Sequence, residues 1–340
     1  MDTPLSEWVG AEEKFAAMFL DVPLDPEAQI PLSPISAIHW VIADAGFAVP
    51  EHWKEWIGSV AAESIELANL TLLSKVPSRN PNVVDEDSKA VEANATDFYT
   101  GLLLTSPFGC SDDPVLLSGS REGETLGVRS HSRFPRPMQH PFRYAVRVDL
   151  KVVQNASRFA LALSRLRSDT SSTWRFLRVL QLYIDARSET DQLERLHQFC
   201  RCIEGFILPD PGDTKRQFKS RTELFIGPRH HDLMGRIYDA RSAAEHLNEH
   251  ILLEPFDRST RLEIIKQLAI AEHIARYCIT KTLDDPTLFQ HFRTVEAQKA
   301  FWALPATERK GIWGAPIDPS KALEGFNPNH ISDRDLGRYE

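Results

Sequence analysis

The spacing of apolar positions divides the chain into two halves. From about residue 154 to residue 304, apolar residues recur three and four positions apart, which predicts a series of helices. We expect these helices near residues 154–167, 172–188, 190–207, 214–226, 231–250, 258–282 and 286–303. Asp213 or Thr214, and Asp257 or Ser259, are residue types that favour the capping position before a helix. The second half is therefore predicted to be an all-α bundle.

The helix predicted at residues 231–250 has the clearest pattern. Its apolar positions are four, three, four, three and four residues apart, so they form one stripe along a helix: Leu233, Ile237, Ala240, Ala244, Leu247 and Ile251. The other side is polar and carries Arg241, Ser242, Glu245 and His246. Gly235 is the only poor helix former in the segment, at a cost of about 1 kcal/mol. We expect the apolar stripe to pack on a core and the polar side to remain accessible.

The first half has shorter and more varied patterns. We expect residues 1–47 to be mainly irregular because of their prolines, and residues 51–74 to form a helix after Pro50. Short β-prone segments separated by Gly, Ser and Pro favour a small, mainly antiparallel sheet: residues 98–104, 115–117, 126–129 and 143–153. The prediction is an α+β domain over residues 1–152, a helical domain over residues 153–304 and an extended C-terminal tail over residues 305–340.

The composition is ordinary for a globular protein, with 42% apolar and 26% charged residues. No run approaches the roughly 18 apolar residues of a membrane span, and the first residues are acidic where a secretion signal is basic. The four cysteines lack the spacing of a zinc site or a disulfide framework: Cys110, Cys200, Cys202 and Cys278. We therefore expect a cytoplasmic protein with reduced thiols, no membrane contact, no metal and no cofactor.

The net charge of −9 hides an uneven distribution of charged residues along the chain. Residues 1–120 carry 19 acidic and 5 basic side chains, whereas residues 121–178 carry 12 basic and 4 acidic ones. A basic segment next to the helical half is suited to phosphate, so we expect RNA contacts from four arginines: Arg158, Arg165, Arg167 and Arg175. Alternatively, these arginines neutralise the acidic half of the same protein. That acidic half is itself a candidate surface for a protein partner.

Arg241 and His246, separated by four residues on the helix at 231–250, resemble the R-x4-6-H signature of HEPN domains. The wider segment IYDARSAAEHL, at residues 237–247, resembles the ApeA-like bacterial branch, and the resemblance covers roughly residues 150–303. It implies a HEPN-like helical bundle with metal-independent endoribonuclease activity, in the style of toxins and anti-phage effectors. It also implies a homodimer in which both copies contribute to one composite site, and products with 2′,3′-cyclic phosphate ends.

The chemistry of Arg241 and His246 suits this reaction. Histidine has a pKa near the working pH, which fits proton transfer, and arginine stays charged and holds phosphate oxygens with two donors. On one ideal helix the two residues are about 140° apart, so a compact pair requires two copies. Five other residues are candidates for supporting roles beside the pair or on the preceding helices: Ser242, Glu245, Asp239, Glu204 and Arg221.

A second interpretation of the same residues remains open. Glu245 follows Arg241 by four positions, which is the distance of an ordinary ion pair along a helix. Glu204 and Arg221 are a carboxylate and a guanidinium on neighbouring helices, so they could form a buried ion pair that braces the two helices. On this interpretation the helical domain is a non-catalytic module for dimerisation or for binding RNA or protein. In this module the acidic front half contacts a protein partner. On the nuclease interpretation, we expect by analogy that the N-terminal region senses a trigger or holds the nuclease inactive.

Overall fold

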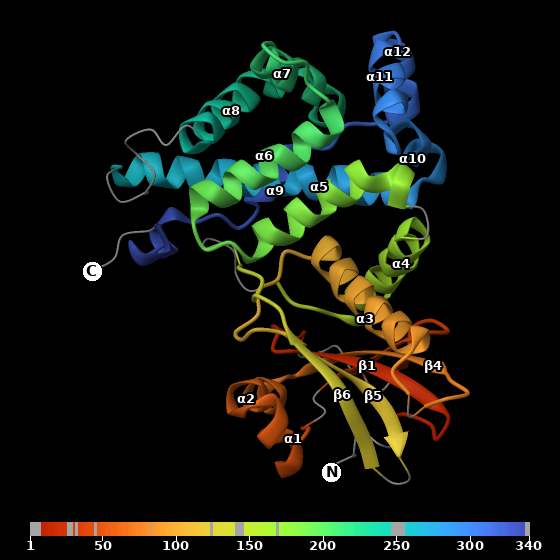
Figure 1. Ribbon diagram of the computed structural model, residues 1–340. Coiled ribbons are helices and arrows are strands. Elements are labelled where there is room, and N and C mark those ends of the chain that lie inside the picture. Colours follow the sequence, from red (N-terminus) through yellow and green to blue (C-terminus); the bar gives the residue numbers. More distant parts are fainter. Residues whose placement is uncertain are drawn as a thin grey trace. The chain divides into compact units, whose positions relative to one another are not determined.

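The computed structural model describes residues 8–25, 30, 33–43, 46–81, 83–122, 125–139, 146–167, 170–245 and 256–336. The chain divides into two compact units. The sheet unit contains the described residues up to Gln139 together with residues 146–165, and the helical unit contains those from Leu166 onward. An α+β region followed by a helical region is therefore confirmed (Figure 1).

The sheet unit is built on one antiparallel sheet in the order β2-β3-β4-β1-β5-β6. Its strands are β1 (Glu13–Leu20), β2 (Ser33–Pro34), β3 (His39–Ala43), β4 (Leu70–Pro77), β5 (Val115–Glu122) and β6 (Thr125–Arg133). β1 lies inside the sheet, paired with β4 on one side and β5 on the other. The predicted antiparallel arrangement is confirmed, and β5 and β6 contain the predicted segments 115–117 and 126–129.

Helices cover both faces of this sheet (Figure 1). On one face, α1 (Glu51–Ile57) and α2 (Ser59–Leu67) share an apolar core with alternate residues of β1. On the other face, α3 (Glu86–Thr105) packs against β1 and β4. Asp85 begins α3 with a capping box, in which its side chain accepts hydrogen bonds from the backbone of Asp87 and Ser88.

Two predictions for the N-terminal 80 residues are wrong. Residues 1–47, predicted to be irregular, contain the central strand β1 and also β3. The predicted helix at residues 51–74 is interrupted at Gly58, which has φ 85°, and the strand β4 begins at Leu70. A strand covered on both faces has no polar alternation, so the apolar run of β1 lacks the usual pattern of a strand.

Two predicted strands in the first half are also wrong. Phe98–Leu104 forms the last two turns of α3, where every side chain is buried. The segment at 143–153 contains no named strand among its described residues, 146–153, and a helix, α4 (Leu150–Arg167), begins within it. Short apolar runs fit a buried helix and a buried strand equally well, which explains both errors.

The predicted domain boundary at residue 152 differs from the boundary between the units, because most of α4 belongs to the sheet unit. Its buried side includes Val153, Phe159 and Leu163. α4 approaches α3 so closely that a Cβ atom on Gly101 would lie 2.1 Å from the carbonyl oxygen of Ala156. This contact requires glycine at position 101, and it ties α4 to the sheet.

The helical unit follows the predicted periodicity closely. Its main helices are α5 (Thr170–Ser188), α6 (Gln192–Ile207), α7 (Thr214–Ile226), α8 (His231–Glu245), α9 (Arg258–Asp284), α10 (Pro286–Phe292) and α11 (Val295–Ala303). The long α9 packs against α5, α6, α7 and α8. As predicted, Asp257 caps α9 through the backbone of Thr260, and Asp213 occupies the capping position of α7 without a side-chain hydrogen bond. The single helix predicted at residues 286–303 is divided, with Thr294 capping α11.

The prediction of an extended tail over residues 305–340 is wrong for the part that is described. This segment forms the helix α12 (Ala306–Trp313) and the short 3-10 helices η3 (Pro319–Leu323), η4 (Pro328–His330) and η5 (Arg334–Leu336). Trp313 is buried, with its ring 4.5 Å from that of Phe225 on α7. Asp333 pairs with Arg258 on α9 at 3.0 Å. Buried apolar residues at intervals therefore hold a proline-rich segment against the bundle.

Candidate functional site

Arg241 belongs to α8, and its side chain lies where α8 packs against α6. Its side chain is 9% exposed, and its Nη2 donates to Glu204 Oε2 on α6 at 3.2 Å. Its Nη1 donates to Oε2 of Glu245, one turn further along α8. The guanidinium also lies 5.6 Å from the ring centre of Tyr238. Two carboxylates and an aromatic ring therefore fix the position of this arginine (the Arg241 site).

The burial of Arg241 differs from its predicted place on an accessible polar side. Ile237, four residues earlier, is fully buried, and residues four apart lie on the same side of a helix. Arg241 thus extends the buried side of α8 and needs carboxylates there, because burying an unpaired guanidinium costs several kcal/mol. The prediction that Arg241 and Glu245 form an ion pair is confirmed.

His197 on α6 was not among the predicted site residues. It precedes Glu204 by seven residues, so both side chains lie on the same side of α6. His197 is buried, and within the described part of the chain its Nδ1 has no hydrogen-bond partner. Burial lowers its pKa, and the nearby charge of Arg241 acts in the same direction. The seven-residue spacing from Glu204 on an amphipathic helix was the signal that could have revealed it.

The carboxylates of the Arg241 site differ in exposure. The Glu204 side chain is 16% exposed and that of Glu245 is 40% exposed. Burial raises the pKa of Glu204, and the charge of Arg241 opposes this shift. Glu204 is thus the inner, fixed partner of Arg241, and Glu245 is the outer partner that solvent reaches.

The structure brings only some of the predicted residues together. Glu204, Arg241 and Glu245 are in contact, and Ser242 is half-buried beside them. Asp239 is exposed and pairs with Lys215 on α7 at 2.6 Å, so it does not position Arg241. His246 lies outside the described residues.

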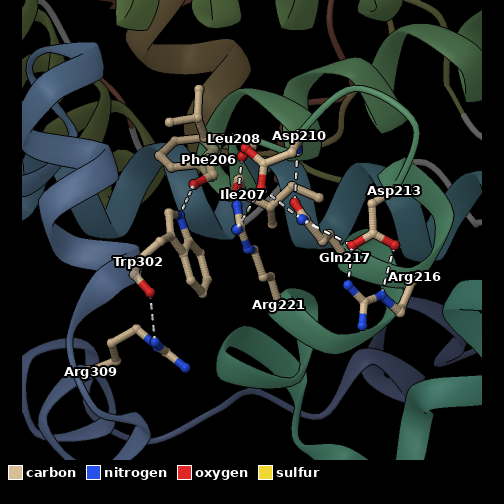
Figure 2. A network of polar contacts seen from close by, with 10 residues as sticks. All are labelled: Phe206, Ile207, Leu208, Asp210, Asp213, Arg216, Gln217, Arg221, Trp302 and Arg309. Carbon is tan, nitrogen blue, oxygen red and sulfur yellow. Dashed lines mark hydrogen bonds and ion pairs between the residues drawn. The ribbon is translucent and has the colours of Figure 1, made fainter.

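Arg221, the remaining candidate for a supporting role, has a different environment. Its Nη1 donates to the carbonyl oxygens of Ile207 and Leu208 at the end of α6, the former at 2.7 Å (Figure 2). Carbonyls in the last turn of a helix lack partners within the helix, and Arg221 supplies one. Its charged partner is Asp210, at 3.6 Å. Arg221 therefore caps α6 and does not pair with Glu204.

The four arginines predicted to contact RNA do not have equivalent environments. Arg158 and Arg165 are exposed on the part of α4 that belongs to the sheet unit, and Arg167 is exposed at the end of the same helix. Arg175 on α5 is half-buried, and its Nε donates to the carbonyl of Gly205 at 3.4 Å. Burial lowers the pKa of Arg175. Arg175 thus contributes to the packing of α5 on α6, whereas the other three face solvent.

A second buried cluster of charges lies among α5, α6 and α9. Arg187 pairs with Glu272 at 3.7 Å, and both side chains are almost fully buried. Arg195 is equally buried, and burial lowers its pKa to about 10. Burial also raises the pKa of the neighbouring Tyr183 to about 12. The cluster explains why Glu272 occupies the apolar side of α9, and it acts as a brace between helices.

Other classes of site gain no support from the described residues. Across these ranges, no three His, Cys, Asp or Glu side chains gather in an arrangement that would hold a metal. No helix in the described part is long and apolar enough to cross a membrane. Three of the four cysteines, Cys200, Cys202 and Cys278, are buried thiols. No family model matches the chain, and neither the curated proteins nor the solved structures contain a significant match.

Proposed function

We propose that the helical unit is a metal-independent endoribonuclease of the HEPN type, acting as a homodimer in the manner of toxins and anti-phage effectors. The observation that supports this is the two-sided support of Arg241. Glu204 fixes the guanidinium from the buried side, and Glu245 occupies its solvent side. An arginine held in this way can bind a phosphate in the position that the Glu245 carboxylate occupies.

In the proposed reaction, a scissile phosphate displaces the exposed Glu245 while Glu204 keeps Arg241 in place. Charge-assisted bonds from guanidinium to phosphate are strong and directional, so a phosphate can replace the carboxylate of Glu245 as the partner of Arg241. The ribose 2′-oxygen bonds to phosphorus and the bond from phosphorus to the 5′-oxygen breaks, leaving a 2′,3′-cyclic phosphate and a 5′-hydroxyl. Arg241 stabilises the negative charge that develops on the phosphoryl oxygens, and His246 moves the proton of the 2′-hydroxyl to the leaving 5′-oxygen.

The alternative function is a non-catalytic helical module for dimerisation or for binding RNA or protein. Its support is that both terminal nitrogens of Arg241 already bond carboxylates. That arrangement is sufficient for a brace between α6 and α8. On this alternative, changes at Arg241 alter the stability of the bundle and leave RNA intact.

The test is incubation of the full-length protein with total RNA in EDTA, with analysis of the product ends. We expect cleavage to cyclic phosphate ends, and a loss of rate of about 100-fold or more in His246→Asn, because proton transfer contributes about that much. Arg241→Lys keeps the charge opposite Glu204 but loses the planar fork, so we expect a comparable loss with the fold retained by circular dichroism. His250→Asn is the matched control and should cleave normally.

Two outcomes would argue against the nuclease. Cleavage that survives both His246→Asn and Arg241→Lys would assign the activity to other residues or to a contaminant. A folded parent that leaves RNA intact, and whose RNA binding is unchanged in Arg241→Lys, would support the non-catalytic module. A 2′-deoxy substrate should resist cleavage, because it lacks the attacking oxygen.

A further inference from the structure

A basic pocket lies among α7, α11 and α12, all within the helical unit. Its volume is about 300 Å³, which is within the range of small-molecule sites. Three cations line it, namely Arg221, Arg309 and Lys310, against one carboxylate, Glu223. Neither the proposed nuclease reaction nor the Arg241 site uses these cations.

Trp302 organises the pocket. Its side chain is largely buried, and its indole nitrogen donates to the carbonyl of Phe206 at 3.0 Å, which fixes the ring (Figure 2). The guanidinium carbons of Arg221 and Arg309 lie 5.2 and 5.4 Å from the ring centre. Such cation–π contacts orient guanidinium groups without removing their charge. The ring therefore positions two cations, and it is not free to stack a nucleic-acid base.

The hydrogen bonds of the two arginines also leave their charge in place. Arg221 donates to the carbonyls that end α6, and Arg309 donates to the carbonyls of Trp302 and Leu304 at the end of α11, the former at 2.8 Å. These acceptors are neutral. Each of these bonds uses only Nη1. The other donors of Arg309 therefore remain for a ligand, whereas Nη2 of Arg221 also lies 3.6 Å from Asp210.

The negative charge near the pocket does not balance these cations. Across the described residues, no carboxylate lies within ion-pair distance of Arg309 or Lys310. Asp210 is 3.6 Å from Arg221 but mostly exposed. Glu223 already accepts a hydrogen bond from His231 at 2.6 Å. Burial lowers the pKa of Arg221. The negative charge of Asp210 raises this pKa, and the positive charge of Arg309 lowers it.

We propose that this pocket binds a small phosphorylated molecule, whose phosphate is held by Arg221, Arg309 and Lys310. A phosphate monoester carries close to two negative charges at neutral pH and offers three acceptor oxygens, which matches a pocket with excess positive charge and oriented donors. The size of the pocket and the occupied Trp302 ring favour a compact ligand over a single-stranded nucleic acid, whose bases need free aromatic faces.

Isothermal titration of the full-length protein with inorganic pyrophosphate at low salt tests the proposal. We expect saturable binding with one site per chain, competed by inorganic phosphate. Lys310→Gln should weaken it roughly tenfold, the effect of one charged hydrogen bond, and Arg309→Gln should weaken it further. Lys310 is exposed, so its variant leaves the fold intact. Lys299→Gln is the matched control, because Lys299 is an exposed lysine of α11 that does not line the pocket.

Each outcome of the titration either supports or overturns the proposed phosphate site. Binding of pyrophosphate that is lost in the pocket variants and kept in Lys299→Gln supports the site, whether or not the protein cleaves RNA. Absence of saturable binding, or equal affinity in all variants, would overturn the proposal. A single-stranded RNA that binds through Lys310 and Arg309 while pyrophosphate does not would overturn it in favour of a nucleic-acid surface.

Discussion

His39 shows how strongly burial acts on a single residue of the sheet unit. It lies on β3 with its ring stacked 4.4 Å from that of Phe98, and its Nδ1 is 2.8 Å from Ser157 Oγ on α4. Burial lowers its pKa from 6.5 to about 4, against a backbone hydrogen bond with Asn94 that acts in the opposite direction. The histidine therefore stays neutral in the folded protein over a pH range where the unfolded chain binds a proton.

We predict that His39 makes the protein less stable as the pH falls from about 6.5 to about 4. In this range the unfolded state binds more protons than the folded state, so the free energy of unfolding decreases as the pH falls. A pKa difference of about 2.5 units, at about 1.4 kcal/mol per unit, gives a loss of about 3 kcal/mol. Urea unfolding at several pH values measures it.

The variant His39→Phe isolates this contribution. It keeps the stacking on Phe98 but cannot be protonated, so its free energy of unfolding should depend less steeply on pH than that of the parent. His52→Phe, an exposed histidine of the same unit, should retain the parent slope. Equal slopes in the parent and in His39→Phe would show that His39 does not couple folding to pH.

At the Arg241 site, residues close in sequence were predictable and residues far apart were not. The pair Arg241–Glu245 follows from a four-residue spacing on one helix. Glu204 was a candidate for a brace, but its partner proved to be Arg241, 37 positions away. The pocket around Trp302 depends on which helices meet, and the periodicity of the sequence does not determine that.

Among the elements, the helices of the second half were predictable because each has one apolar side. α7 has the predicted bounds, and α5, α6 and α9 differ from theirs by only a few residues. β1 and the end of α3 were not predictable in this way, since both are buried on every side and carry no polar alternation. Periodicity reports a boundary between core and solvent, so it fails where an element has no solvent side.

The packing of α5 on α6 leads to a prediction at Gly205. A Cβ atom at this position would lie 2.1 Å from Cγ2 of Val179 on α5. Valine has little freedom to change rotamer in a helix, so overpacking should cost about 2–3 kcal/mol, the upper part of the usual range. We expect Gly205→Ala to destabilise the protein by about 1–2 kcal/mol, despite a gain of about 1 kcal/mol in helix propensity. Urea denaturation measures the difference.

Gly311 on α12 provides the matched control. No atom lies within 4 Å of a Cβ built there, so Gly311→Ala should leave stability unchanged or raise it by up to about 1 kcal/mol. If Gly205→Ala is as stable as the parent, α5 and α6 are not in close contact at this position. Partial recovery in Gly205→Ala with Val179→Ala would assign the cost to this one contact.

For the whole molecule, the decisive feature is that α4 completes the sheet unit and does not begin the helical one. α4 buries an apolar side that includes Val153, Phe159 and Leu163, and its Ser157 bonds His39 on the sheet. Its helical periodicity resembles that of α5, so periodicity alone assigned it to the helical half. Assignment to a unit depends on which surface covers the apolar side, and that surface is α3 with its close contact at Gly101.

We therefore predict that a fragment of residues 1–165 folds on its own, whereas a fragment of residues 1–152 does not. Removing α4 leaves the apolar surface of α3 in water, at about 25 cal/mol for each Å² exposed, and deprives His39 of its hydroxyl partner. Circular dichroism should show cooperative thermal unfolding for the longer fragment, and a broad transition or aggregation for the shorter one. If the fragment of residues 1–152 unfolds as cooperatively as the longer one, α4 is not part of the core of the sheet unit.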